Sequence, residues 1–151
     1  MNSETISLNI VNVDEEVASV MNKFKRLRKI DSSATIVLSI NNETNDVHLD
    51  QIDGESIIMD RSLEDIAEEL VAEYLPKQML RIPHVKTKDN RSSFPLCNIW
   101  YCPQNMANAE LNMKYTSLRH KIIEMLNPQK LYQVSNHEEL TDEWLAEEMD
   151  M

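Results

Sequence analysis

The chain has 151 residues, of which 42% are hydrophobic, and a formal net charge of −11, so it has the size and apolar content of one globular domain and is too acidic for a nucleic-acid partner to be expected. It contains one glycine, Gly54, which excludes the glycine-rich loops that cradle phosphates in Walker and dinucleotide-binding proteins. Its four histidines are scattered and its acidic pairs fall on predicted helix surfaces, so we expect no metal, no cofactor and no catalytic site.

The N-terminal region predicts an arm followed by a helix. Residues 1–11 show only a weak alternation of apolar side chains, which favours a flexible arm or a short edge strand, with the domain itself spanning 12–151. Apolar residues then recur at helical spacing over 13–28. Asn12 stands in the N-cap position of this helix and Glu15 in the capping-box position, so we expect the helix to begin there.

The next segment predicts a β-hairpin and a second helix. Residues 34–40 are apolar and rich in β-branched side chains, and a turn-forming stretch separates them from the short run 46–49. Residues 50–61 predict a loop. Ser62 is a helix N-cap, and we expect Pro76 to end the amphipathic helix that follows.

Two strands of different character come next. Residues 79–85 predict a strand, but Pro83 has no N–H donor and therefore favours a sheet edge, a bulge or a short strand. The charged segment 86–93 predicts a loop. Residues 94–102 form the most apolar stretch of the chain, which is typical of a central strand covered on both faces.

The last third predicts a long helix, a short strand and a final helix. We expect the long helix to begin near Asn108 and to stop before Pro128, and the strand to lie at 131–134. Thr141 is the predicted N-cap of the final helix. Strands that alternate with amphipathic helices indicate an α/β (α+β) fold, in which a central mixed β-sheet is sandwiched between α-helices.

The cysteines indicate the redox environment. Cys97 and Cys102 are five positions apart in and beside a predicted strand, so their side chains point to opposite faces and a disulfide between them is not expected. No leader-like segment and no apolar run long enough to span a bilayer is found in the sequence. We therefore expect a cytoplasmic protein with reduced thiols and no membrane partner.

Three segments carry a resemblance to a known family. Residues 24–29, Phe-Lys-Arg-Leu-Arg-Lys, resemble an Arg-Phe-Arg-Lys signature. Residues 93–97, Ser-Phe-Pro-Leu-Cys, resemble Ser-Tyr-Pro-Leu-Cys, and residues 138–145, Glu-Glu-Leu-Thr-Asp-Glu-Trp-Leu, resemble Glu-Asp-Leu-Thr-Glu-Glu-Trp-Leu. In this order the segments resemble the glia maturation factors, a branch of the actin-depolymerising-factor/cofilin homology family, and the resemblance covers residues 14–149.

The resemblance implies the actin-depolymerising-factor homology fold and a non-enzymatic function. Glia maturation factors bind the actin-related protein 2/3 complex, inhibit branched actin nucleation and promote debranching of filaments. By resemblance we expect these activities here, in the cytoplasm at cortical actin structures, with actin at branch junctions as a second contact. We expect a monomer without cofactors.

Two groups of residues are candidates for the partner-binding surface. Five of the fifteen basic residues fall within seven positions, at Lys23, Lys25, Arg26, Arg28 and Lys29. In an acidic chain this is either an electrostatic docking patch or a helix end whose cations favour the macrodipole. The second group is the flank of the long helix formed by Lys114, Ser117 and Lys121, with Met113 beside it. It is either the partner surface that the resemblance implies or an ordinary solvated face.

The alternatives are a cofilin-like protein that severs or depolymerises filaments and a small cytosolic enzyme. Cofilin-branch relatives need lysines at the start of the long helix, where this chain has Glu110 and Asn112. A carboxylate there disfavours contact with the actin cleft that accepts those cations. The enzyme alternative requires a pocket with convergent polar side chains of shifted pKa.

Overall fold

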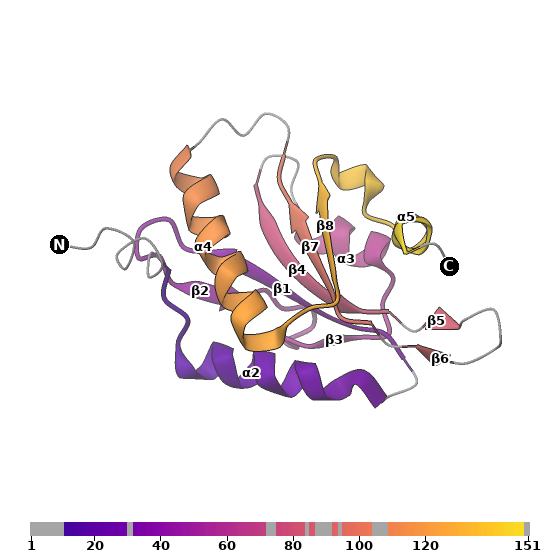
Figure 1. Ribbon diagram of the computed structural model, residues 1–151. Helices are drawn as coiled ribbons and strands as arrows, with labels where there is room; N and C mark the ends of the chain where they lie inside the picture. Colours follow the sequence, from indigo (N-terminus) through magenta and orange to yellow (C-terminus); the bar gives the residue numbers. More distant parts are fainter. Residues whose placement is uncertain are drawn as a thin grey trace.

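The computed structural model describes residues 11–29, 32–71, 75–83, 85–86, 92–93, 95–103 and 109–149, without the side chains of residues 28, 29, 85, 86, 92 and 93. A mixed sheet forms the centre of the molecule, in the order β2-β1-β4-β7-β8 (Figure 1). Its strands are β1 (Ala34–Ile40), β2 (Val47–Leu49), β3 (Ile58–Met59), β4 (Lys77–Ile82), β7 (Cys97–Tyr101) and β8 (Lys130–Val134). Only the β7–β8 pair is parallel among these strands, and β3 pairs with β1 beside β2.

Four helices of the described residues cover the two faces of the sheet. They are α2 (Glu15–Lys25), α3 (Leu63–Leu70), α4 (Ala109–Leu126) and α5 (Asp142–Glu148). Helices α2 and α4 lie over one face, and α3 and α5 lie over the other (Figure 1). Short 3-10 turns follow α2 (η1, Arg26–Lys29) and precede α5 (η2, His137–Glu139). The predicted sandwich of a mixed sheet between helices is therefore confirmed.

Strand alternation divides the apolar core into two layers. In β1, Ile36 and Leu38 belong to the layer under α2 and α4, whereas Val37 belongs to the layer under α3 and α5. All residues of β1 and β7 are buried. This burial agrees with the prediction that the apolar stretch 94–102 forms a central strand covered on both faces. Cys97 and Cys102 are both free and pack in opposite layers, which confirms the prediction made from their odd spacing.

The first helix begins later than predicted. Its N-cap is Asp14, whose Oδ1 accepts from the N–H of Val17 at 2.8 Å. Asn12 instead forms a bridge to Asp46, and its Nδ2 donates to the Asp46 carboxylate at 3.1 Å. The predicted arm lies outside the described residues except for Val11, which is 2% exposed and part of the core. Asn12 was misassigned because its side chain bonds a residue that is distant in the sequence.

Two other predictions on strands need correction. Strand β4 is central, between β1 and β7, and not at an edge, because it ends at Ile82, one residue before Pro83, so the proline removes no bond from the ladder. The predicted loop 86–93 contains three of the four residues of a small two-stranded antiparallel sheet, β5 (Val85–Lys86) with β6 (Ser92–Ser93).

The segment 50–61 is more ordered than the predicted loop. Ile52 and Glu55 exchange backbone hydrogen bonds around Asp53 and Gly54. Both turn residues have positive φ, 54° and 79°, the geometry of a type I′ turn, in which Asp-Gly is a preferred pair. The only glycine of the chain therefore occupies a position that requires its conformational freedom.

Helix α3 begins as predicted and ends early. The Ser62 hydroxyl caps it by accepting from the Asp65 N–H at 3.2 Å. The helix ends at Leu70 and not at Pro76, because Val71 is already extended, with ψ at 117°.

Helix α5 begins as predicted. Thr141 is its N-cap, and the Thr141 Oγ1 accepts from the Trp144 N–H at 3.0 Å.

Candidate partner-binding surface

The exposed start of α4 is the clearest candidate surface. Glu110 and Asn112 are exposed, and Met113 is 55% exposed, a high value for a large apolar side chain. These residues lie in the first turns of the helix, and the predicted start at Asn108 lies outside the described residues. A protruding methionine beside polar groups is suited to insertion into a partner's cleft.

Lys114 does not belong to this exposed surface, contrary to the prediction. It is 5% exposed, its Nζ donates to the backbone oxygen of Asn42 at 3.2 Å, and it forms an ion pair with Glu110 at 3.2 Å. Its long aliphatic stem allows burial while the ammonium group finds acceptors. Lys114 therefore fastens α4 to the turn between β1 and β2.

Ser117 is buried like Lys114, whereas Lys121 keeps some access to solvent. Ser117 is 3% exposed, so its prediction as part of an exposed flank is wrong as well. A helical residue three positions from Lys114 shares its face, and here that face is turned toward the sheet. Lys121 is half-buried and is the one cation of the predicted flank with access to solvent.

Tyr115 fixes the position of α4 over the sheet. Its hydroxyl accepts from the Ile40 N–H and donates to the Pro76 carbonyl, both at 3.2 Å. Its ring lies 4.8 Å from the Trp100 ring, centroid to centroid. Burial raises the pKa of the Tyr115 hydroxyl to about 12, so the phenol remains neutral and keeps its donor proton.

The basic cluster lies at the end of α2 and in η1. Lys23, Lys25 and Arg26 are exposed, and no described carboxylate is within ion-pair distance of them, whereas Phe24 between them is fully buried. The side chains of Arg28 and Lys29 lie outside the described part of the structure. The C-terminal end of α2 and the start of α4 are at different ends of the molecule (Figure 1), so the two predicted groups do not form one continuous patch.

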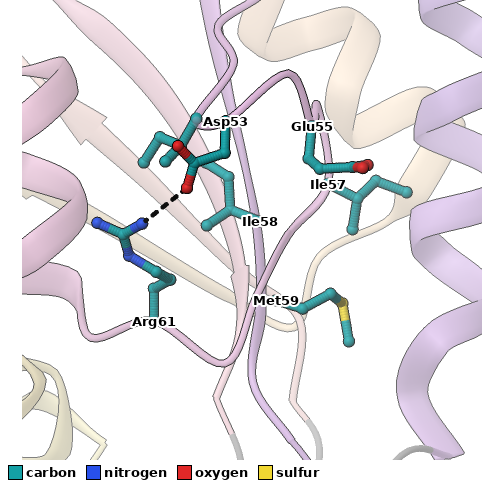
Figure 2. Close-up of a pocket in the computed structure, with 7 residues that line it drawn as sticks. Asp53, Glu55, Ile57, Ile58, Met59 and Arg61 are labelled. Carbon is teal, nitrogen blue, oxygen red and sulfur yellow. Dashed lines mark ion pairs between the residues drawn. The ribbon is translucent and has the colours of Figure 1, made fainter.

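The pocket beside β3 does not gather a set of catalytic groups among its described lining residues. One pocket of about 240 Å³ lies beside β3 (Figure 2). Across it Asp53 faces Arg61, with 3.9 Å between Oδ2 and Nη1, and the remaining lining residues that the structure describes are one glutamate and apolar side chains. Because Arg61 also pairs with Glu69 at 2.8 Å, its pKa is raised. The pocket therefore offers an ion pair and one further carboxylate, and its described lining residues include no serine, threonine, cysteine or histidine.

A second hollow was not anticipated from the sequence. A groove of about 430 Å³ lies between α4 and β8, and its lining residues include Trp100, Arg119, His120, Ile123 and Leu131. The guanidinium carbon of Arg119 is 5.7 Å from the centroid of the Trp100 ring. The exposed positions 116, 120 and 123 follow the helical spacing i, i+4, i+7, a signal that was available in the sequence.

The fold, with a long helix that carries the candidate surface, is the setting for a comparison with known protein families. The sequence model of the cofilin/tropomyosin-type actin-binding proteins matches residues 10–150, and the chain therefore belongs to that family. The family is non-enzymatic, which confirms the expectation that the protein is not an enzyme.

Within this family the chain is similar to glia maturation factors. Glia maturation factor beta of Homo sapiens is 29% identical over 147 residues, which is 95% of each chain. Glia maturation factor of Drosophila melanogaster is 27% identical over 136 residues, 90% of this chain and 93% of the relative. The solution structure of the Caenorhabditis elegans glia maturation factor superposes with a TM-score of 0.73 at 28% identity and covers 92% of this chain and 95% of that one.

More distant structures share the fold alone. Plasmodium berghei actin depolymerization factor 2 has a TM-score of 0.65 at 17% identity, with 93% of this chain and 97% of that one covered.

None of the helices within the described ranges has the length and hydropathy needed to cross a bilayer.

Proposed function

We propose that this protein binds the actin-related protein 2/3 complex, inhibits branched actin nucleation and promotes filament debranching, in the cytoplasm at cortical actin structures. The glia maturation factors among its relatives support the proposal. Actin at branch junctions is a second contact in this proposal, and the protein acts as a monomer.

The observation that carries the proposal is the chemistry at the start of α4. Glu110 is 77% exposed at its side chain and Asn112 is exposed, where the resemblance to the cofilin branch would require lysines. A carboxylate and an amide at these positions remove the attraction to an acidic actin cleft and add repulsion. Met113 remains as an apolar anchor between them and the rest of the helix.

We assign the partner-facing roles to Met113 and Lys121 on α4 and to the cluster Lys25, Arg26, Arg28 and Lys29. Lys114 and Ser117 act from behind this surface, because their burial lets them set the position of the helix and leaves them no access to a partner. The basic cluster steers the encounter with an acidic surface, an effect that is screened beyond a Debye length of about 8 Å at physiological salt.

Co-sedimentation with actin filaments, with and without the actin-related protein 2/3 complex, tests the proposal. We expect pelleting that depends on the complex, and faster loss of branches when the protein is added to branched networks. The double variant Glu110→Lys with Asn112→Lys should gain binding to bare filaments. Tight pelleting of the unmodified protein with pure filaments would instead establish the cofilin-like function.

The basic cluster is tested separately by association kinetics. Arg26→Ala should slow association with the complex and flatten its dependence on salt, while dissociation changes less. Lys130→Ala, an exposed cation on β8, is the matched control for the loss of one charge. Equal rates and equal salt slopes for the two variants would leave the cluster as a solvated helix end.

A further inference from the structure

The groove between α4 and β8 has two chemically distinct ends. Leu131 on β8 is 57% exposed and Ile123 on α4 is 38% exposed, and both line the groove. Gln133 pairs in register with Trp100, so the end of the groove near Gln133 is the one where Arg119 lies over the indole. One end is therefore apolar and the other is aromatic and cationic.

Strand β8 is an edge strand whose main chain can accept another strand. It is the last strand in the sheet order of the described residues, and four of its five residues are exposed or half-buried. The Lys130 N–H donates to the Leu96 carbonyl, and the Val134 carbonyl accepts from the Cys102 N–H. Because alternate residues of a parallel strand bond to the same neighbour, the backbone N–H and C=O groups of Leu131 and Gln133 point away from β7.

The outward-pointing residues are also those that line the groove. In the register of the sheet Leu131 is opposite Asn98 and Gln133 is opposite Trp100, and all four residues line the groove. A strand added to β8 would therefore place every second side chain over the groove, about 6.6 Å apart. The spacing lets one such side chain meet Leu131 and Ile123 and the next reach Arg119.

The groove holds polar groups that lack partners within the described structure. Asn98 is 1% exposed, and its Nδ2 donates to no described residue. Arg119 donates to the Thr116 hydroxyl at 3.3 Å, but no described carboxylate lies within ion-pair distance of it. Its guanidinium has five N–H donors, so most of its donor capacity is available for an anionic ligand.

We propose that β8 and this groove bind an extended acidic segment of a protein partner by strand addition. The segment pairs with the main chain of Leu131 and Gln133. It places an apolar side chain against Ile123 and Leu131 and, two positions away, a carboxylate against Arg119. Main-chain pairing provides affinity, and the pair of side-chain positions provides specificity. The surface differs from the start of α4 and from the basic cluster, so it is independent of the function proposed above.

Charge favours this occupant over a second copy of the chain. Each copy has a net charge of −11, so edge-to-edge pairing of two copies is opposed by repulsion between two highly charged chains. A short acidic segment carries far less charge and places its carboxylate directly against the Arg119 guanidinium. The exposed Lys130 at the start of β8 also disfavours self-pairing.

The test uses three synthetic peptides and amide NMR titration of the full chain. The peptide Thr-Glu-Thr-Leu-Thr-Glu-Thr is the same in both directions, so it places leucine and glutamate on one face in either strand orientation. Thr-Lys-Thr-Leu-Thr-Lys-Thr reverses the charge, and Thr-Glu-Leu-Thr-Thr-Glu-Thr puts leucine and glutamate on opposite faces. We expect the first peptide to shift the amide signals of Leu131 and Gln133 and the indole signal of Trp100, and the other two to bind at least several-fold more weakly.

Variants of the protein separate the two parts of the proposal. Arg119→Gln should weaken binding about tenfold, equivalent to about 1.4 kcal/mol, whereas Lys130→Gln should change it little. Gln133→Pro removes an outward N–H and should abolish binding. If Gln133→Pro does not fold, as judged from its amide spectrum, Leu131→Ser takes its place with an expected severalfold loss.

Three results would overturn the proposal: equal binding of the lysine peptide, shifts confined to another surface, or unchanged affinity of Arg119→Gln. Sedimentation of the free protein as a dimer that Gln133→Pro dissociates would assign the edge to self-association instead.

Discussion

Replacing Asp142 tests how the C-terminal helix is held to the sheet. The Asp142 carboxylate accepts from Arg81 Nη2 at 2.8 Å and from the Leu63 N–H at 3.3 Å. Arg81 is 3% exposed, and its other bonds go to the Thr35 hydroxyl and the Arg61 carbonyl, both at 2.8 Å. Burial lowers the pKa of Arg81, and the charge of Asp142 opposes that shift. Asp142→Ala would leave a buried guanidinium without its counter-ion.

The magnitude follows from the bonds that are lost. Both lost bonds are accepted by the Asp142 carboxylate, and a hydrogen bond to a charged group contributes about 1.5–3 kcal/mol. The Asp142 side chain is 48% exposed, so solvent screening brings the total toward the lower end. We expect Asp142→Ala to lower the free energy of unfolding by about 2–3 kcal/mol, and Asp142→Asn, which keeps an oxygen acceptor, by about 1 kcal/mol.

Urea unfolding followed by circular dichroism measures these differences. Glu143→Ala is the matched control, because Glu143 is exposed in the same first turn of α5 and its loss costs only a helix-dipole contribution of about 0.5 kcal/mol. Equal losses for Asp142→Ala and Glu143→Ala would refute the reasoning. A double-mutant cycle with Arg81→Met should give a coupling energy above about 0.5 kcal/mol.

Three further predictions concern buried polar groups. Lys114→Ala should destabilise the fold by about 1–2 kcal/mol in urea unfolding, whereas Lys121→Ala should stay within about 0.5 kcal/mol; the reverse order would show that Lys114 is not the buried fastening residue. Burial raises the pKa of Cys97 and of Tyr115 to about 12, from ordinary values of 9.0 and 10.0, so the unfolded chain ionises first. The contribution of these two groups to stability is complete below about pH 9 and should be lost as pH rises toward 12. Tyr115→Phe should flatten the part of this decline that begins near pH 10, and an unchanged curve would contradict the assignment. Cys102, which is half-buried, should react with a thiol reagent in the native protein while Cys97 reacts only after unfolding, as mass mapping of the labelled thiol would show.

Local patterns predicted the elements whose signals are short-range. The Ser62 and Thr141 caps and the β1 run are set by neighbours within four residues, and the structure has them where the sequence indicated. Asn12 shows the limit of this approach. It has the side chain of an N-cap but bonds Asp46, 34 residues away, so its role depends on a tertiary contact.

The candidate site was predictable in position and not in detail. Resemblance indicated the long helix, and in the structure its apolar stripe, which includes Tyr115 and Leu118, is buried in the core. A lysine next to such a stripe is normally solvated. Lys114 is buried because the turn carrying Asn42 supplies an acceptor, and nothing near Lys114 in the sequence announces that acceptor. The groove was not predictable for a related reason. Its walls come from α4 and β8, and only the tertiary structure brings these two elements together.

The anchoring of Tyr115 has a consequence for the entropy and kinetics of recognition. Its hydroxyl joins the end of β1 to the residue before β4, and α4 cannot tilt or slide without breaking both bonds. Met113, two residues away on the same helix, is therefore presented by a body that moves together with the sheet. A partner that captures it has little internal freedom of this helix to remove, which reduces the ordering cost of association. Binding at this helix should accordingly follow a single kinetic phase, set by encounter and docking rather than by a preceding rearrangement of the fold.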